Sequence, residues 1–252
     1  MSIENWLTSL RDEGALLAEV AGSTAPTARV PTCPDWALRD LLLHVGGVHR
    51  WATTIVREAR AEPIALVNSH DIVAELPTDD ELVDWFRAGH AALVDALAAA
   101  PADLACWTFM RTGSDSAAFW ARRQAHETTI HRMDAEAAVG RYTPVAPDLA
   151  ADGIDELLTG FVPRNRKLRG ETERTLLVSA TDLGRHWFVR LGPDRPRISA
   201  SDQPTAADTT ISGPAAVLYP VLWNRRPWDG LTVTGDAELA ARWSDAVRVT
   251  WS

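Results

Sequence analysis

Residues 116–140, SAAFWARRQAHETTIHRMDAEAAVG, decide the fold of the first half of the chain. They predict a long helix from about Ser116 to Val139, which ends at Gly140 because glycine readily adopts the conformation that closes a helix. One face of this helix carries mostly polar residues: Trp120, Arg123, Gln124, Glu127, His131 and Asp134. The face that contains Phe119 and Met133 is only slightly more apolar, so periodicity leaves open which side is buried.

The sequence HETTIH at residues 126–131 is one residue longer than the HExxH motif of zinc proteases. A helix turns about 100° per residue, so His126 and His131 lie roughly 140° apart around the axis and cannot easily bind one ion. Glu127 and His131 are four residues apart, which places them on one face and one turn apart. The usable metal-binding pair is therefore Glu-x-x-x-His. The alternative is a solvated Glu–His pair that stabilises the helix by roughly a few tenths of a kcal/mol.

A third ligand is available from a second helix, which is predicted from about Pro34 to Arg60 with Thr32 and Asp35 at its cap. His44 lies on a largely apolar face of this helix and is expected to point into a bundle. Helix bundles build metal sites from side chains on facing helices, although a single histidine on an apolar face is more often a core residue. Two histidines and one carboxylate leave positions open and suit a catalytic divalent metal: zinc, nickel, cobalt or iron.

Two further long helices complete the predicted bundle. Apolar residues at helical spacing predict one helix over residues 3–22. The residues Thr78–Glu81 form a capping box by their spacing and begin another helix that reaches Pro101. A short helix over residues 147–161 is expected to close this half of the chain.

The pattern changes in the second half. Short apolar, partly β-branched runs predict four strands, at residues 173–182, 185–193, 209–214 and 231–236. Helical stretches follow the last two strands. The fold class predicted is α plus α/β: a four-helix bundle at residues 1–162, a polar and basic linker at 163–173, and a small α/β domain at 174–252.

Composition excludes several classes of protein. Residues 1–160 hold 12 arginines and 24 acidic residues, a formal charge of −12, whereas residues 161–252 carry 13 basic and 10 acidic residues, or +3. The acidic half would repel phosphate, and the other half lacks a dense basic cluster, so we expect no nucleic acid partner and favour a small acidic molecule. The sequence shows no membrane span and no secretory signal, and it has only two cysteines. These features predict a cytoplasmic protein without membrane attachment.

Three segments together resemble a known family. Residues 30–51 (VPTCPDWALRDLLLHVGGVHRW), 119–140 and 210–251 are similar to the mycothiol-dependent maleylpyruvate isomerases of actinobacteria, whose N-terminal domain is a DinB/YfiT-like four-helix metalloenzyme bundle. The resemblance implies metal ligands at His44, Glu127 and His131, the same residues that helix geometry selects. It further implies zinc as the metal and mycothiol as a thiol cosubstrate.

The resemblance also implies an activity. Mycothiol, activated as a thiolate, would add to the double bond of a maleylpyruvate-like cis-enedioate; the adduct would rotate about the new single bond and expel the thiolate, leaving the trans isomer. The alternatives are a mycothiol S-transferase acting on electrophiles, a non-catalytic sensor that binds metal or ligand, and a metal-dependent hydrolase. Expected partners are a thiol and a small acidic or electrophilic substrate, and the protein is expected to be a monomer or a weak homodimer.

Cationic side chains are candidates for holding substrate carboxylates, because arginine offers two parallel hydrogen bonds to a carboxylate. Arg225 and Arg226, in the sequence WNRRPWDG, would serve if the C-terminal domain covers the metal; alternatively they are solvated at the end of a helix. Arg123 is a further candidate, or else a partner of the metal ligand Glu127. Asp134, three residues after His131, could orient the imidazole of that ligand.

The remaining histidines and cysteines are weaker candidates. His49, about 140° around the helix from His44, is predicted to lie at the surface or behind a ligand. Cys33 is predicted to be a small buried residue rather than a thiol whose pKa is lowered at a helix N-terminus. Histidines without a partner at ligand spacing are His70, His90 and His186.

Overall fold

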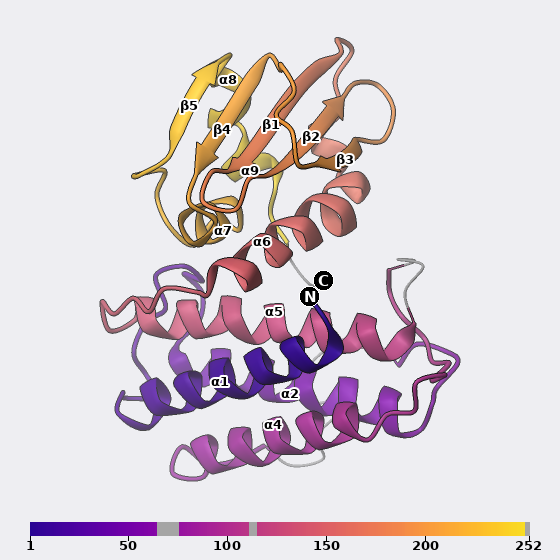
Figure 1. Ribbon diagram of the computed structural model, residues 1–252. Helices are drawn as coiled ribbons and strands as arrows, with labels where there is room; N and C mark the ends of the chain where they lie inside the picture. The colour runs from indigo at the N-terminus through magenta and orange to yellow at the C-terminus, as the bar shows by residue number, and fades with distance from the viewer. Residues whose placement is uncertain (65–75, 111–114, 250–252) are drawn as a thin grey trace. The chain divides into compact units, whose positions relative to one another are not determined.

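The computed structural model describes residues 1–64, 76–110 and 115–249, so His70 lies outside the described residues. The chain divides into two compact units, Met1–Thr143 and Pro144–Ser252. The first unit is helical and the second combines a five-stranded sheet with helices, which confirms the predicted fold class (Figure 1). No helix within the described ranges is both long enough and apolar enough to cross a lipid bilayer.

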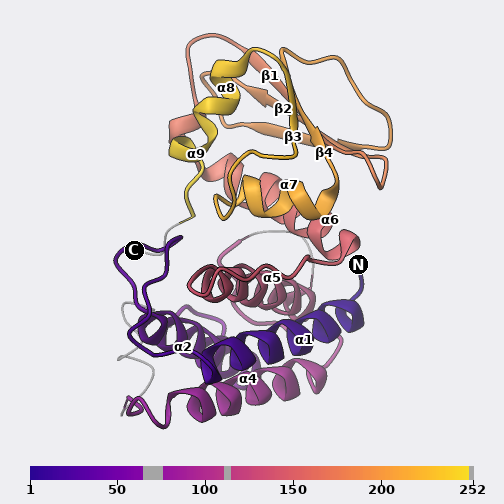
Figure 2. The ribbon, with the colours of Figure 1, turned by 90° about the vertical axis from the view of Figure 1, so that its left-hand side faces the viewer.

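Four long helices form the bundle of the first unit: α1 (Ile3–Gly22), α2 (Leu38–Arg57), α4 (Leu82–Ala98) and α5 (Ser116–Ala137). α1 and α2 each pack against α4 and α5, so every helix has two main neighbours (Figures 1 and 2). The core between them is built from fully buried apolar side chains, among them Leu17, Leu41, Leu42 and Phe86. Burial of these side chains, at about 1.5–3 kcal/mol each, provides the main driving force for assembly of the bundle.

α2 begins at Leu38, four residues later than predicted. The segment ahead of it folds back on itself instead of continuing the helix: the amide of Val30 donates to the carbonyl of Trp36, and Arg29 forms a β-bridge with Ala37. The side chain of Asp40 accepts a hydrogen bond from the amide of Ala37 and so closes the N-terminus. The predicted cap at Thr32 and Asp35 is therefore wrong, and the Thr32 side chain is available for another contact.

Gly46 allows α2 and α4 to approach closely. A Cβ atom at this position would lie 2.1 Å from the indole ring of Trp85 on α4, closer than real side chains pack. The helix therefore continues through Gly46 as predicted, and the glycine is explained by packing rather than by a break in the helix.

α5 is buried on all of its faces along most of its length, which resolves the ambiguity of its sequence pattern. Several of the polar side chains on these faces are paired, some with residues of α5 itself and some with other elements. Arg132, fully buried, donates to Glu13 of α1 and to Glu136 of α5, each at 2.7 Å. Both faces of α5 are therefore interior, and neither is the solvated face of an ordinary amphipathic helix.

The sheet of the second unit has the strand order β3-β2-β1-β4-β5. Its strands are β1 (Arg174–Ala180), β2 (Arg185–Leu191), β3 (Arg197–Ser201), β4 (Thr209–Gly213) and β5 (Thr232–Gly235). Only β1 and β4 run parallel; the other neighbours are antiparallel. The strand β3 is missing from the sequence prediction because it is a short, mostly exposed edge strand in which only Ile198 and Ala200 are apolar, an alternation too short to stand out.

Helices line one face of this sheet (Figure 2). They are α6 (Pro147–Glu156), which continues into a π-helical turn (Leu157–Phe161), together with α7 (Ala215–Leu222), α8 (Ala237–Ala241) and α9 (Trp243–Ala246). Two short 3₁₀ turns, Val162–Arg164 and Arg166–Leu168, precede β1.

The boundary between the units lies earlier than the linker predicted at residues 163–173, because α6 belongs to the second unit. α6 packs against α7, and the indole of Trp223 donates to the carbonyl of Gly153 at 3.1 Å. The indole of Trp187, on β2, donates to the carboxylate of Asp155 at 2.9 Å. Leu168, in the middle of the predicted linker, is itself buried, so that segment is part of the folded domain.

Candidate metal centre

Three side chains from two helices converge in the first unit. His44 lies on α2, and Glu127 and His131 lie one turn apart on α5. Nε2 of His44 is 3.3 Å from Oε1 of Glu127, and Nε2 of His131 is 3.2 Å from the same oxygen. One ligand atom from each residue lies within 4.8 Å of the others, and within the described ranges no other group of three or more His, Cys, Asp or Glu residues meets this condition.

The donor atoms suit a divalent metal. Two imidazole nitrogens and one carboxylate oxygen form the ligand set of many catalytic zinc sites, and such a set also accepts nickel, cobalt or iron. Both histidines direct Nε2 at the shared oxygen, so all three donors face one point. The side chains of Glu127 and His131 are 6% and 8% exposed, whereas that of His44 is 19% exposed, which opens the cluster to solvent on the α2 side.

Arg123 holds the other oxygen of Glu127. Its Nη2 lies 2.8 Å from Oε2 of Glu127, one helical turn away, and the guanidinium is almost fully buried. Burial alone would raise the pKa of Glu127, but hydrogen bonds from His131 and His44 and the charge of Arg123 hold it well below its usual range. The carboxylate is therefore ionised, as a metal ligand must be. The ion pair favours Arg123 as the partner of Glu127 over a role in holding substrate.

Asp134 orients His131. Its Oδ2 accepts a hydrogen bond from Nδ1 of His131 at 2.8 Å, and its Oδ1 accepts one from the hydroxyl of Thr32 at 2.5 Å. Burial would lower the pKa of His131, but hydrogen bonds to Asp134 and Glu127, and the charges of both, raise it to about 9. With Nδ1 committed to Asp134, Nε2 is the nitrogen that faces the cluster. This arrangement agrees with the orienting role predicted for Asp134.

The segment ahead of α2 forms one wall of the site. The ring of Trp36 lies 4.9 Å from that of His44 and 6.2 Å from that of His131, measured between centroids. Cys33 is half-buried, with its sulfur 3.8 Å from Oδ2 of Asp134. Neither was predicted at the site from the sequence: Trp36 was not singled out, and Thr32 was placed at the cap of a helix. Pro31 and Pro34 were the sequence signal that the segment before α2 is not helical, because proline disfavours helical backbone in the residue before it.

The other histidines occupy different environments. His126 is fully buried and does not belong to the cluster. His49 is also fully buried, so the prediction that it lies at the surface is wrong; the alternative, a place behind a ligand, fits its hydrogen bond of 2.9 Å to Thr128, the neighbour of Glu127 in sequence. Burial, followed by the charge of His90, lowers the pKa of His49 well below its usual range.

The two arginines predicted to bind substrate lie in the second unit, after α7. Nη1 of Arg225 donates to the carbonyl of Trp223 at 2.9 Å, and Arg226 is exposed. Neither belongs to the cluster formed by α2 and α5.

Two sequence families match the chain on either side of the unit boundary. Residues 7–136 match the family described as mycothiol maleylpyruvate isomerase N-terminal domain, and this match covers more than half of the chain. The chain belongs to the mycothiol maleylpyruvate isomerase family. Residues 148–242 match the C-terminal domain of the same family, which begins inside the second unit.

Solved structures of the mycothiol maleylpyruvate isomerase family share the fold of this chain. A crystal structure of the mycothiol-dependent maleylpyruvate isomerase aligns with a TM-score of 0.65 at 14% sequence identity and covers 93% of both chains. A structure of its histidine-to-alanine mutant aligns equally well. A comparison with curated proteins found no match. At this identity the structures establish the common two-part fold, and the chemistry must be argued from the residues of this chain.

Proposed function

We propose that this chain is a metal-dependent enzyme that activates a low-molecular-weight thiol, mycothiol, for the cis–trans isomerisation of a maleylpyruvate-like enedioate. The observation that supports this proposal is the convergence of His44, Glu127 and His131 on one point within the family's N-terminal domain. A divalent metal bound by these residues would lower the pKa of a coordinated thiol and so supply a thiolate near neutral pH.

The neighbouring residues prepare the ligands for this role. Arg123 fixes one oxygen of Glu127 and leaves the other directed at both imidazoles. Asp134 fixes the ring of His131 through Nδ1, and Thr32 fixes Asp134 in turn. Side chains held in this way lose little freedom when a ligand binds, which is the general advantage of a preorganised site.

Access for a thiol and a substrate is on the side of His44 and Trp36, where the cluster is least buried. The indole of Trp36 provides an apolar surface next to the ligands, against which a bound thiol or substrate could pack. The roles predicted for Arg225 and Arg226 in holding substrate carboxylates stay predictions. Replacement of both by glutamine is expected to raise KM for an enedioate more than it lowers kcat.

Metal analysis of the purified protein tests the centre. The wild-type protein should bind about one equivalent of zinc, nickel, cobalt or iron, and Glu127→Ala should lose most of it. His126→Gln is the matched control, because His126 lies in the same motif outside the cluster and should leave metal content unchanged. A wild-type protein that takes up none of these metals, or a Glu127→Ala variant with full metal content, would overturn the assignment.

Accounting for the thiol tests the reaction. Incubation with mycothiol and maleylpyruvate should convert the cis to the trans isomer without consuming thiol. Stoichiometric conjugation of mycothiol to monobromobimane, without isomerisation, would replace the proposal by an S-transferase. Metal binding without any thiol-dependent turnover would favour a sensor, and turnover that needs the metal but no thiol would favour a hydrolase.

A further inference from the structure

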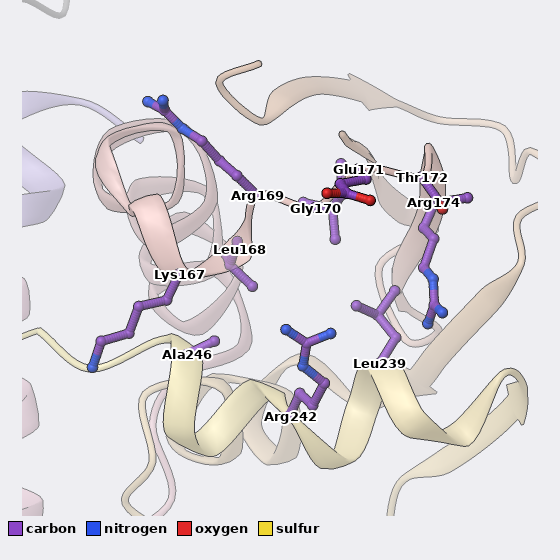
Figure 3. A pocket seen from close by; sticks show the side chains of 11 residues that line it. Lys167, Leu168, Arg169, Gly170, Glu171, Thr172, Arg174, Leu239, Arg242 and Ala246 are labelled. Atoms are coloured by element: carbon purple, nitrogen blue, oxygen red, sulfur yellow. The ribbon is translucent and has the colours of Figure 1, made fainter. Parts of the chain in front are cut away.

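The second unit contains a cavity of about 180 Å³ that the proposed reaction does not use (Figure 3). Its walls are the segment 167–172, the start of β1, the end of β2, and the helices α8 and α9. The apolar part of the lining consists of buried side chains: Leu168, Leu191, Leu239 and Ala246. All of the lining residues lie within one unit, so the cavity belongs to the second unit alone.

One arginine that lines this cavity, Arg242, is exposed to solvent. The guanidinium of Arg242 points into the space between Leu168 and Leu239 (Figure 3). Within the described part of the chain, no carboxylate lies within salt-bridge distance of Arg242. Arg174, at the rim, differs: its Nη1 is 2.8 Å from Asp236 and 3.8 Å from Glu238. The side chains of Lys167 and Arg169 point away from the cavity (Figure 3).

The lining therefore combines the exposed guanidinium of Arg242 and other polar groups with a set of buried apolar side chains. A guanidinium forms its strongest contacts with a planar carboxylate, through two parallel charge-assisted hydrogen bonds. Leucine side chains on either side of it suit a short hydrocarbon body, while the rest of the lining is largely polar. The volume is below that of a drug-sized site and limits the ligand to a small organic acid.

We propose that this cavity binds a small aliphatic carboxylate, with the carboxylate on Arg242 and the hydrocarbon chain against Leu168 and Leu239. Glu171, which is exposed, lies across the cavity from Arg242 (Figure 3). Its negative charge opposes the ligand's carboxylate and reduces the affinity of the site. The site is separate from the cluster on α2 and α5, and its occupancy does not depend on the metal.

An NMR titration of the full-length protein with butanoate tests the proposal. We expect saturable binding of one equivalent, with the largest shifts at Arg242 and in α8 and α9. Arg242→Gln should weaken binding by about tenfold or more, because it removes a charge-assisted contact. Glu171→Gln should tighten binding a few-fold, because it removes a repulsive charge. Butylamine, with the same chain and the opposite charge, should not bind.

Two control variants separate this site from other sources of binding. Arg248→Gln removes an exposed arginine near α9 that lies outside the cavity, and it should leave the affinity unchanged. Glu127→Ala should also leave it unchanged, since that residue is in the other unit. The proposal fails if butanoate does not saturate at millimolar concentrations, if Arg242→Gln binds as well as the wild type, if Glu127→Ala abolishes binding, or if inorganic phosphate binds equally well.

Discussion

Nδ1 of His131 donates a hydrogen bond of 2.8 Å to the carboxylate of Asp134, and the hydroxyl of Thr32 donates to the second oxygen of the same carboxylate. This chain of contacts joins a candidate metal ligand on α5 to the segment that precedes α2. In that segment Thr32 contacts α5 instead of capping α2. The site thus depends on contacts behind its ligands as well as on the ligands themselves.

Replacement of Asp134 by asparagine should weaken metal binding by about 10–100-fold, because the amide keeps the shape of the side chain but loses the charge that fixes the imidazole. Competition with a chelator of known affinity measures the effect. Asp148→Asn, which changes an exposed aspartate of α6, is the control and should bind metal like the wild type. Equal metal affinities for the wild type and Asp134→Asn would show that Asp134 does not orient His131 for metal binding.

The metal-free protein should lose stability as pH rises. The pKa of His131 is about 9 in the folded state and about 6.5 in an unfolded chain. Between these pH values His131 is protonated in the folded protein but not in the unfolded chain. This contribution is fully present below about pH 6.5 and is lost as pH rises through 9; it amounts to on the order of 3 kcal/mol. Denaturant unfolding of chelator-treated protein from about pH 6 to about pH 9.5 measures it.

The variant His131→Gln is the reference for this pH dependence, because it cannot bind the proton. Its stability should change less over the same range than that of the metal-free wild type. Metal-saturated wild type should also lack the decline, since binding displaces the proton from Nε2. Parallel curves for the metal-free wild type and His131→Gln would show that His131 is not protonated in the folded state.

Two adjacent arginines of α5 should respond differently to substitution. Arg123→Met leaves the buried carboxylate of Glu127 without its cation and should destabilise the protein by about 3–5 kcal/mol. Arg122→Met, at a half-buried position, should cost much less. Thermal unfolding together with metal content measures both effects. If Arg123→Met retained full stability and raised only KM, the residue would be a substrate anchor and not a partner of Glu127.

Gly46→Ala should destabilise the bundle, because the added methyl group meets the Trp85 ring and forces α2 and α4 apart. Overpacking of this kind costs about 1–3 kcal/mol. Gly22→Ala, at the end of α1, is the control: its nearest contact is the end of the Arg87 side chain at 4.0 Å, so the free energy of unfolding should not fall. A similar result for both variants in denaturant unfolding would contradict the tight packing at Gly46.

Much of the fold could be predicted from local sequence. The four long helices and four of the strands follow from apolar spacing and from turn residues, because these patterns reflect the period of each element. Predictions failed where position in the fold mattered more than local pattern. β3 is an exposed edge strand, and α6 was assigned to the bundle because its sequence is helical, although its buried side packs on α7.

Within the site, helix geometry determined the pairing of Glu127 with His131 and the exclusion of His126, because a helix turns by a constant angle per residue. Only the tertiary structure decided the rest. The contacts of Thr32 with Asp134, and of His44 with Glu127, join residues 102 and 83 positions apart, and their distances depend on how the bundle packs. The burial that opposes the pKa shifts of Glu127 and His131 has the same origin, because desolvation depends on neighbours from the helices around them.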